Sequence, residues 1–598
     1  NNPDFTAYMT AKAKKSAGTM PAVAPVSALD RFGYCPPPLD RSADAGKDIT
    51  LQLPENRAAA LASYIAPGED LSFGVSDSSF DLRGQSKLTA IRDQGDYGTC
   101  WAFASLASLE SNLLPAETWD FSENGVAMNS GFFTDSTDLM NYGGNTFMSS
   151  AYLLRWAGPV NETDDPYDGV RRTGKPVRKH MQETLWLPAK TSQAYSATYI
   201  NNVKAAIVSY GAVAASIYWD GAAAVSIPAK PYYYFYNSHC TISNGSRNCQ
   251  AQSSRAGGHL IALVGWVDNL DRTSFTTSAN GTPAGDGAWL ARNSWGSEIG
   301  DGGYFYISYY DTSHGCETAV FHTAEETSNY TRQYGYDTLG WTNSIGSGLT
   351  GWMAMQAVSA EAGETIKSVG FYNTESGAAQ YNIYIYTGSA AGAPRSGTLA
   401  YSAAGTLALS GYHTIPLATP VTLRNAGTRF SAVVRLANQS YVYPIPIEYN
   451  DGFYSAKANA SANETFYSDD GGSWTDLTEM YAKTSACLKA YTSASQAGGI
   501  DTSTIVVKGY PSPCDFKKNA TMTLGGLLTG QTNVKIRVYS LSGQLVRTFD
   551  RIDGLTPANQ ALWDGKNQAG ERVASGVYIV LFTADAMNPK TEKVAVFW

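Results

Sequence analysis

The sequence predicts a multidomain protein in which an irregular leader precedes one α+β domain and two all-β sandwich modules. Its 598 residues correspond to about three or four domains at roughly 100 to 200 residues each. Only 16% of the residues are charged, against a usual figure of about 25%, and 57 Gly and 38 Tyr are present, which is typical of β-rich extracellular modules. Helical and strand patterns mix between residues 78 and 325, whereas alternating strand patterns dominate afterwards.

Charge and hydropathy exclude two classes of partner. The 43 Lys and Arg residues against 52 Asp and Glu give a net charge of −9 without a basic block, so we expect no nucleic-acid surface. No run of about 18 apolar residues occurs, so we expect no membrane span. The chain begins Asn1-Asn2-Pro3 without an apolar signal segment, and we expect any secretion signal to have been removed or not included.

The first element is the leader, residues 1–75. It is irregular, with small residues and lysines near its start and a proline cluster at Pro36-Pro37-Pro38. This composition predicts a pro-segment.

The second element, residues 76–325, contains a segment with the features of a reactive cysteine. Between Gln94 and Ala104 a glycine-rich turn runs into an amphipathic helix, which places Cys100 at the helix N-terminus. There the helix dipole and the unsatisfied N–H groups favour an anion. The pKa of the thiol is thereby lowered, and the nucleophilic thiolate is populated.

A catalytic thiolate also needs a proton acceptor, and among the six histidines the surroundings of His259 differ from the rest. His259 follows two glycines and precedes a buried strand, so its ring can approach another element closely. Further along, Asn293 lies between a strand and a glycine turn, beside Trp295, whose indole can shield a hydrogen bond. We interpret the other five histidines as structural.

These segments resemble the motifs of the papain family of cysteine peptidases, in the same order along the chain. The family's Q-G-x-x-G-x-C-W-A-F is matched by 94–103, its strand histidine by Gly258-His259 and its N-S-W-G by 293–296. Shorter matches occur at Phe80 to Arg83 and Phe121 to Asn124. The resemblance implies a two-lobed α+β peptidase fold that acts on protein or peptide substrates. We expect no cofactor and no metal. Structural zinc is not expected because the chain has no C-x-x-C pair.

The resemblance also implies a role for each matched residue. Cys100 is expected to be the nucleophile, His259 the general base and then the general acid, and Asn293 the residue that orients the imidazole. Gln94 is expected to donate to the oxyanion beside the backbone N–H of Cys100.

Other positions are expected to contact the substrate on the same grounds. Phe321 takes the place where the family forms the floor of its main specificity pocket, so we expect a shallow apolar pocket that accepts small or medium hydrophobic side chains. The residues expected to bind substrate are Gly143, Gly144, Gly258, Trp295 and Phe321.

The leader departs from the family pattern. It is short for the family's helical inhibitory prosegment, and the E-R-F-N-I-N pattern of that prosegment is absent. The stretch from Arg31 to Pro38 is extended and aromatic. Two alternatives remain open: this stretch lies in the substrate cleft, or it is a strap on the surface.

The seven cysteines leave the disulfide pairing open. Cys316 resembles the family's late cysteine, whose partner lies just before the histidine strand, and Cys249 fits that position. Alternatively, Cys240 closes a nine-residue loop with Cys249. Cys487 and Cys514 could tether the last two modules.

The third element, residues 330–495, resembles the lectin-like β-sandwich that accompanies some prokaryotic papain-like peptidases. The matching pieces are 336–341, 411–415 and 486–491. A glycan or cell-surface ligand is therefore a possible partner. The aromatic residues that could stack on sugar rings are Trp352, Tyr441 and Trp474.

The fourth element, residues 505–598, resembles the FlgD-type Ig-like module and the C-terminal sorting domains of secreted bacterial proteins. The matching pieces are 509–514, 539–544, 563–566 and 574–578. The resemblance implies export or retention at the cell surface.

Together these elements predict a secreted bacterial cysteine endopeptidase, made as a zymogen. The alternative is a papain-like adhesin or carbohydrate-binding surface protein without catalytic activity. A third hypothesis uses the same site for transpeptidation, since an amine can replace water in deacylation.

Overall fold

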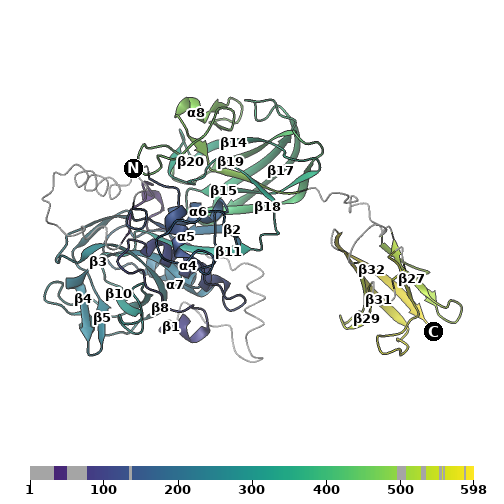
Figure 1. Ribbon diagram of the computed structural model, residues 1–598, viewed down its shortest axis with the longest axis horizontal. Coiled ribbons are helices and arrows are strands. Elements are labelled where there is room, and N and C mark those ends of the chain that lie inside the picture. Colours follow the sequence, from purple (N-terminus) through teal and green to yellow (C-terminus); the bar gives the residue numbers. More distant parts are fainter. Residues whose placement is uncertain are drawn as a thin grey trace. The chain divides into compact units, whose positions relative to one another are not determined.

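The computed structural model describes most of the chain beyond the leader (Figure 1). The described residues are 33–49, 77–133, 138–494, 507–526, 534–550, 555–556, 559–584 and 587–598. The chain divides into two compact units, Asn1–Ala494 and Ser495–Trp598. Residues 1–32 and 50–75 of the predicted leader, and most of the linker predicted near residues 493–504, lie outside the described residues.

Side chains cap the starts of three helices of segment 76–325, but not the start of α4. The bounds of these helices are α4 Cys100–Leu113, α5 Glu123–Asn129, α6 Thr146–Leu154 and α7 Ala197–Tyr210. The side chains of Ser122, Asn145 and Ser196 accept backbone N–H groups in the first turns of α5, α6 and α7. Such caps satisfy N–H groups that have no partner within the helix.

Helix α4 is buried on every side from Cys100 to Ser111, although the sequence predicts a helix with one apolar stripe. The helix packs against strands β8 (Ala256–Val267) and β11 (Thr318–Glu325) and also against α5 and α6. A helix enclosed in this way needs small or apolar residues on all faces, and the Ala and Ser residues of α4 provide them.

One 13-stranded sheet runs through both parts of the first unit. Its order is β12-β24-β15-β18-β2-β11-β3-β8-β9-β10-β5-β4, and β1 also pairs with β8. The strand bounds are β1 Ser79–Asp81, β2 His180–Trp186, β3 Val213–Asp220, β4 Ala224–Ile227, β5 Lys230–Phe235, β9 Ala288–Arg292, β10 Tyr304–Ser308, β12 Arg332–Tyr334, β15 Glu364–Asn373, β18 Ser410–Leu423 and β24 Leu488–Ser493.

Strands β2 and β18 form the junction between segments 76–325 and 330–495. They pair antiparallel, with Thr184 opposite Tyr412. Glu183 on β2 lies 3.4 Å from His322 of β11 and 3.6 Å from His413 of β18, so both of these histidines are structural. Because the two segments share backbone hydrogen bonds, they form one continuous body.

Two further sheets complete segment 330–495, which is an all-β sandwich. Their orders are β17-β16-β19-β14-β21-β22 and β13-β20-β23. The bounds of these strands and of the short helix are β13 Asn343–Ile345, β14 Thr350–Val358, β16 Ala379–Thr387, β17 Thr398–Leu407, β19 Arg429–Ala437, β20 Ile445–Glu448, β21 Thr465–Ser468, β22 Thr475–Asp476, α8 Leu477–Met480 and β23 Ser485–Ala486.

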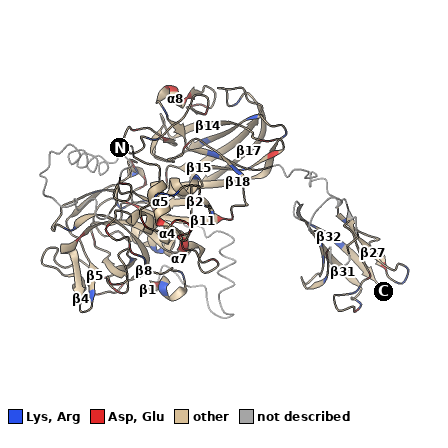
Figure 2. Ribbon diagram, in the orientation of Figure 1, with Lys and Arg blue, Asp and Glu red and all other residues tan. Residues whose placement is uncertain are grey.

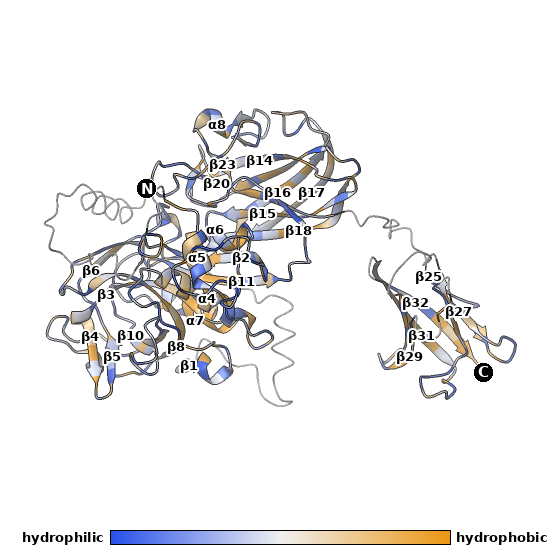
Figure 3. Ribbon diagram, viewed as in Figure 1, coloured by the Kyte–Doolittle hydropathy of each residue, from blue (hydrophilic) through white to orange (hydrophobic). Residues whose placement is uncertain are grey.

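One hydrophobic cluster of the first unit joins the leader, the α+β segment and the sandwich. It includes Tyr34 of the leader, Cys100 and Trp101 of α4, and Trp341 and Tyr454 of the sandwich. A second cluster includes residues of α7 and of neighbouring strands of the sheet, and Figure 3 shows apolar segments among these elements. Burial of this apolar surface stabilises the three parts as one folded body.

The second unit has its own core between two sheets. The sheets have the orders β25-β27-β30 and β26-β32-β31-β28-β29. Their bounds are β25 Val507–Tyr510, β26 Cys514–Asp515, β27 Met522–Gly526, β28 Lys535–Ser540, β29 Leu545–Phe549, β30 Ala561–Trp563, β31 Gly576–Ala584 and β32 Met587–Phe597. The assignment of this unit to the FlgD-type modules remains a prediction.

The disulfide that the structure describes joins Cys240 and Cys249. These two residues face each other across the hairpin of β6 (Cys240–Ser243) and β7 (Ser246–Cys249), with Cα atoms 4.1 Å apart. The pairing of Cys249 with Cys316 implied by the family resemblance is therefore wrong. The predicted tether is also wrong, since Cys487 and Cys514 are not disulfide-bonded and each is completely buried in its own unit.

Charged residues of both signs are spread along the described chain (Figure 2). Within the same residues, no helix combines the length and the apolar character that crossing a membrane requires.

Candidate active site

The four predicted catalytic residues come from four different segments, and all four are buried. Cys100 is the first residue of α4, and Gln94 lies in the turn before that helix. His259 lies near the start of β8, and Asn293 directly follows β9. Because β8 and β9 are antiparallel neighbours, the start of one strand and the end of the other lie at the same edge of the sheet.

A hydrogen bond to Asn293 and a ring contact with Trp295 hold His259. Its Nε2–H donates to Asn293 Oδ1 at 2.9 Å, since the amide oxygen can only accept. The backbone N–H of Ser294 donates to the same oxygen at 2.9 Å, which fixes the orientation of the amide. The Trp295 indole stacks on the imidazole at 4.6 Å between ring centroids. This arrangement keeps water from the hydrogen bond between His259 and Asn293.

The thiol of Cys100 lies at the start of the same strand. The backbone N–H of Leu260, the residue after His259, donates to Cys100 Sγ at 3.4 Å. Burial raises the pKa of the Cys100 thiol to about 12, although hydrogen bonds from the backbone N–H groups of Leu260, Trp101 and Cys100 oppose this rise. The described arrangement therefore favours the protonated thiol.

Gln94 is tied to the segment that carries Asn293. The Ser294 hydroxyl donates to Gln94 Oε1 at 2.6 Å, and the Gln94 backbone N–H donates to the Ser294 carbonyl at 2.8 Å. Gln94 Nε2 donates one of its two hydrogens to the Tyr97 carbonyl at 2.7 Å. The second amide hydrogen is not used in that bond.

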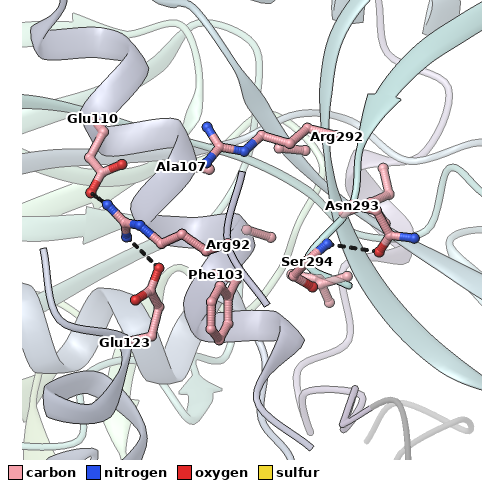
Figure 4. A pocket seen from close by; sticks show the side chains of 12 residues that line it. Arg92, Phe103, Ala107, Glu110, Glu123, Arg292, Asn293 and Ser294 are labelled. Carbon is pink, nitrogen blue, oxygen red and sulfur yellow. Dashed lines mark hydrogen bonds and ion pairs between the residues drawn. The ribbon is translucent and has the colours of Figure 1, made fainter. Parts of the chain in front are cut away.

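A buried ionic cluster supports the two segments on which Gln94 and Asn293 lie (Figure 4). Arg92 donates to Glu110 of α4 at 2.8 Å and to Glu123 of α5 at 2.5 Å. Burial raises the pKa of Glu123 to about 7; Arg92 lowers it in part, and Glu110 raises it further. Removal of Arg92 would leave Glu110 and Glu123 without the cation that joins them, so Arg92 holds this region together.

The leader passes over the predicted substrate-binding glycines. Cys35 N–H donates to the Gly144 carbonyl at 2.9 Å, and Gly144 N–H donates to the Gly33 carbonyl at 2.8 Å. Tyr34 N–H donates to the Gly258 carbonyl at 3.2 Å, and Tyr34 pairs with Gly144 in the parallel direction. Of the stretch from Arg31 to Pro38, the described part, 33–38, contacts Gly144 and Gly258, two of the residues expected to bind substrate.

The fit between the leader and the site is close. Gly33 has a φ of +82°, and a Cβ atom there would lie 2.0 Å from the carbonyl oxygen of Gly98, two residues before Cys100. Only glycine combines this conformation with so close an approach. The leader contacts Gly98 and Gly258, close neighbours of Cys100 and His259 in the sequence, and neither Cys100 nor His259 has exposed surface.

The other residues expected to bind substrate, Gly143, Trp295 and Phe321, are not partners in the leader hydrogen bonds named above. Gly143, with a φ of +79°, shapes the turn before Gly144. Trp295 lies on the imidazole, as described above. Phe321 is completely buried within β11, where its backbone N–H donates to Ser108 of α4 at 3.1 Å. Glu317, four residues earlier, contacts the leader instead: the Tyr34 hydroxyl donates to its Oε2 at 3.0 Å.

Sequence reasoning missed the residues through which the sandwich reaches this site. Asn145, next to Gly144, donates to the Cys35 carbonyl at 2.9 Å and to the Tyr454 hydroxyl at 3.0 Å. Lys47 donates to Glu375 at 2.5 Å. Asn145 and Tyr454, and Lys47 and Glu375, are more than 300 positions apart, and no local pattern marks them. Glu317 does carry a local signal, because it is a charged residue directly before a buried strand.

Comparison with protein families confirms two of the resemblances. Residues 76–324 match the papain family cysteine protease model, and residues 333–492 match the lectin like domain model. A viral cathepsin of Adoxophyes honmai nucleopolyhedrovirus is 27% identical over 231 residues, 38% of this chain and 56% of that protein. A cysteine protease of Blomia tropicalis is 28% identical over 244 residues, 40% of this chain and 62% of that protein. The chain thus spans less than two thirds of each relative.

Solved structures reproduce the fold of the first unit. The cysteine protease and lectin-like domains of Cwp84, a surface layer associated protein of Clostridium difficile, have a TM-score of 0.60 at 19% identity. That match covers 82% of this chain and 97% of the other. A second Cwp84 structure, a C116A form after propeptide cleavage, has a TM-score of 0.58 at 22% identity and covers 70% of this chain. The chain therefore contains a domain of the papain family of cysteine proteases, followed by a lectin-like domain.

Proposed function

We propose that the protein is an exported bacterial cysteine endopeptidase made as a zymogen, with Cys100, His259, Asn293 and Gln94 as its catalytic residues. The observation that carries this proposal is the meeting of the Cys100 thiol with the start of the His259 strand, where Asn293 already holds the imidazole. A nucleophile, a base and an orienting group in hydrogen-bond sequence are the requirements of acyl transfer.

The hydrogen bond to Asn293 determines which nitrogen of the His259 imidazole can accept a proton. Since Nε2 carries the hydrogen donated to Asn293, Nδ1 is the nitrogen that can accept a proton. Nδ1 of His259 therefore takes the proton of the Cys100 thiol. The resulting imidazolium and thiolate form an ion pair at the N-terminus of α4, where the helix dipole also favours the anion.

Hydrolysis then proceeds in two stages. The thiolate attacks the peptide carbonyl carbon, and the oxyanion is stabilised by the Cys100 backbone N–H and by the second amide hydrogen of Gln94. His259 passes its proton to the leaving amine, and a thioester to Cys100 forms. A water molecule, deprotonated by His259, attacks the thioester, and the acid and the thiol are released.

The substrate main chain is proposed to bind where the leader main chain binds. Gly144 and Gly258 supply backbone groups to the leader and can supply the same groups to a peptide once the leader has left. Gly143 sets the turn, Trp295 covers the catalytic hydrogen bond, and Phe321 supports α4 from within the core.

We propose that the leader inhibits the enzyme in two ways: it occupies the groups that bind the substrate, and it keeps water from the Cys100 thiol. Its main chain uses the groups that would bind a substrate, and its burial of Cys100 disfavours the thiolate. Removal of the leader readmits water to the thiol, which lowers the cost of its ionisation.

The remaining modules are assigned to localisation. We divide the chain into a leader (1–75), a peptidase domain (76–325), a lectin-like domain (330–495) and an Ig-like sorting module (505–598). Export is supported by the surface-layer association of Cwp84, which has the same domain pair, and by the disulfide of the peptidase domain. Trp352, Tyr441 and Trp474 are candidates for stacking on a glycan of the cell surface.

The experiment is peptide-bond hydrolysis by the chain after its leader has been cut. A recognition sequence for a site-specific protease, inserted between residues 49 and 77, allows the cut in the purified full-length protein. We expect an unfolded protein substrate to be fragmented, with oxygen from labelled water in the new carboxyl ends, and the Cys100→Ala variant to be inactive. Absence of cleavage by a chain whose leader is cut and whose thiol is reduced would contradict the proposal. Joined peptides without labelled oxygen would indicate transpeptidation.

A further inference from the structure

The side chain of Tyr34 fills a pocket beside the four catalytic residues. Tyr34 has only 5% of its surface exposed, and its ring lies against Gly258, whose added Cβ would be 2.8 Å from the Tyr34 ring. The ring and Glu317 also line one small cavity next to the ring, together with apolar residues such as Phe147 and polar residues such as Asn244 and Ser246. The Tyr34 ring therefore lies among apolar and polar groups, and a carboxyl group lies at the end that the hydroxyl reaches.

Glu317 is fixed in place by groups that do not belong to the leader. Its Oε1 accepts the backbone N–H of Thr146 at 2.9 Å and the Thr146 hydroxyl at 2.5 Å. Thr146 is the first residue of α6, and its hydroxyl also accepts the Trp186 indole N–H at 2.8 Å. This leaves Oε2 directed at the Tyr34 hydroxyl, so the position of the acceptor is set before any ligand binds.

A cation lies over the pocket as well. The guanidinium carbon of Arg247 is 5.5 Å from the centroid of the Tyr34 ring, and the Arg247 side chain donates to the Ser313 carbonyl. A guanidinium above an aromatic face attracts it. The same charge repels a second cation, so it disfavours a lysine or arginine side chain in the pocket despite the carboxyl group of Glu317.

A substrate residue can take the place of Tyr34. In the leader, Tyr34 is opposite Gly144 in a parallel bridge. In parallel and antiparallel pairs alike, the side chains of paired residues lie on the same side of the sheet. A substrate residue opposite Gly144 therefore directs its side chain into the pocket whichever way the substrate runs.

From these contacts we infer that Glu317 and Arg247 make the enzyme selective for tyrosine at the substrate residue that pairs with Gly144. The inference rests on the proposed function, because it concerns the substrate of the same site. It replaces the apolar pocket expected from Phe321, since that residue is enclosed in β11 and Glu317 faces the ligand position.

The selectivity follows from the cost of an unpaired carboxyl oxygen. Phenylalanine fills the same volume but leaves Oε2 of Glu317 buried without the donor it has in the described state. Hydrogen bonds to a charged group affect binding by about 10- to 100-fold, so tyrosine should exceed phenylalanine by that factor. Aliphatic side chains lose the contact with Arg247 as well.

The test uses the protein with its leader cut and peptides that differ only at this residue, with Tyr, Phe, Leu or Arg. We expect kcat/KM for Tyr to exceed kcat/KM for Phe by about 10-fold or more. In Glu317→Gln, the amide oxygen replaces Oε1 at Thr146, so an NH2 group faces the pocket, and the ratio should fall below about 3-fold. Glu364→Gln is the matched control: Glu364 is also buried and accepts a tyrosine hydroxyl at 2.8 Å, but within the lectin-like domain.

A second measurement does not depend on catalysis. Calorimetric titration of the Cys100→Ala protein, after the leader is cut, should show a higher affinity for the Tyr peptide than for the Phe peptide. The additional substitution Glu317→Gln should remove this difference in affinity. Equal affinities, or a ratio that Glu317→Gln leaves unchanged, would overturn the inference. Hydrolysis of none of the peptides would contradict the proposed function, and the calorimetric ratio would still decide the role of Glu317.

Discussion

At the scale of single residues, Gln94 connects the turn before Cys100 to the segment that carries Asn293, and we expect Gln94 to stabilise the oxyanion. We predict that Gln94→Ala lowers kcat/KM by about 10²- to 10³-fold with little change in KM, because one donor to the transition state is lost. Gln356→Ala is the matched control. Gln356 is also buried and bonded through both ends of its amide, to Ala390 and Gly392, but in the lectin-like domain. A loss of less than about 3-fold in Gln94→Ala would exclude Gln94 from the oxyanion site.

Glu123 makes the free energy of unfolding depend on pH. Its pKa is raised from 4.5 to about 7, so the folded state binds this proton more tightly than the unfolded state. The resulting stability is fully present below pH 4.5 and is lost as the pH rises through 7, at up to about 1.4 kcal/mol per pH unit. We predict that Glu123→Gln flattens the free energy of unfolding over this range, measured by urea denaturation. The exposed Glu479→Gln should leave the slope unchanged, and an unaltered slope in Glu123→Gln would refute the assignment.

At the scale of elements, the antiparallel pair of β2 and β18 unites the peptidase and lectin-like domains. Gly411 on β18 lies so close to β2 that an added Cβ would be 2.3 Å from the Thr184 carbonyl oxygen. We predict that Gly411→Val separates these strands and destabilises the first unit by about 1–3 kcal/mol. Gly348→Val is the control, because nothing lies within 4 Å of the Cβ position there. Equal unfolding midpoints for the two variants would show that the pairing contributes little.

The sequence predicted the elements that carry local signals. The turn before Cys100, the strand with His259 and the turn at Asn293 each have their own pattern of glycines and apolar residues, and the structure brings them together. The enclosure of α4 could not be predicted in this way, because it depends on strands and helices from distant segments. The same holds for the pocket of Tyr34, where leader and β11 meet across 283 positions. The sequence alone does not decide the pairing of Cys240 with Cys249, because both alternatives satisfy the spacing.

At the scale of the whole molecule, the leader is held by both folded domains of the first unit. Asp44 accepts the Ser376 backbone N–H at 2.5 Å, and Lys47 donates to Glu375 at 2.5 Å and to the Ser376 carbonyl at 2.7 Å. Burial alone would raise the pKa of Glu375, but Lys47 and donors from residues 440–441 lower it to about 2. The lectin-like domain thus carries an ionised acceptor for the leader.

This contact should influence latency without touching the catalytic residues. We predict that Lys47→Ala raises the rate at which Cys100 reacts with an epoxysuccinyl thiol inhibitor in the uncut protein by about 5-fold, since a partly buried ion pair of this kind contributes about 1 kcal/mol. Lys367→Ala, an exposed lysine of the lectin-like domain, is the control. The rate after the leader is cut should be the same in both variants and in the wild type. An unchanged rate in uncut Lys47→Ala would show that the lectin-like domain does not contribute to latency.

The most direct test of the central claim, that the leader blocks a competent Cys100, is the rate of Cys100 labelling in uncut Gly33→Val. Valine at position 33 would meet the Gly98 carbonyl and would need a φ that β-branched residues rarely adopt, so the leader should leave the cleft. We expect Cys100 of Gly33→Val to be labelled at close to the rate of the protein with its leader cut. The uncut wild type should be labelled slowly. The control Gly174→Ala should also be labelled slowly, because Gly174 has a similar φ but nothing within 4 Å of its Cβ position. Slow labelling of Gly33→Val in a folded, reduced protein, together with slow labelling after the cut, would contradict the claim.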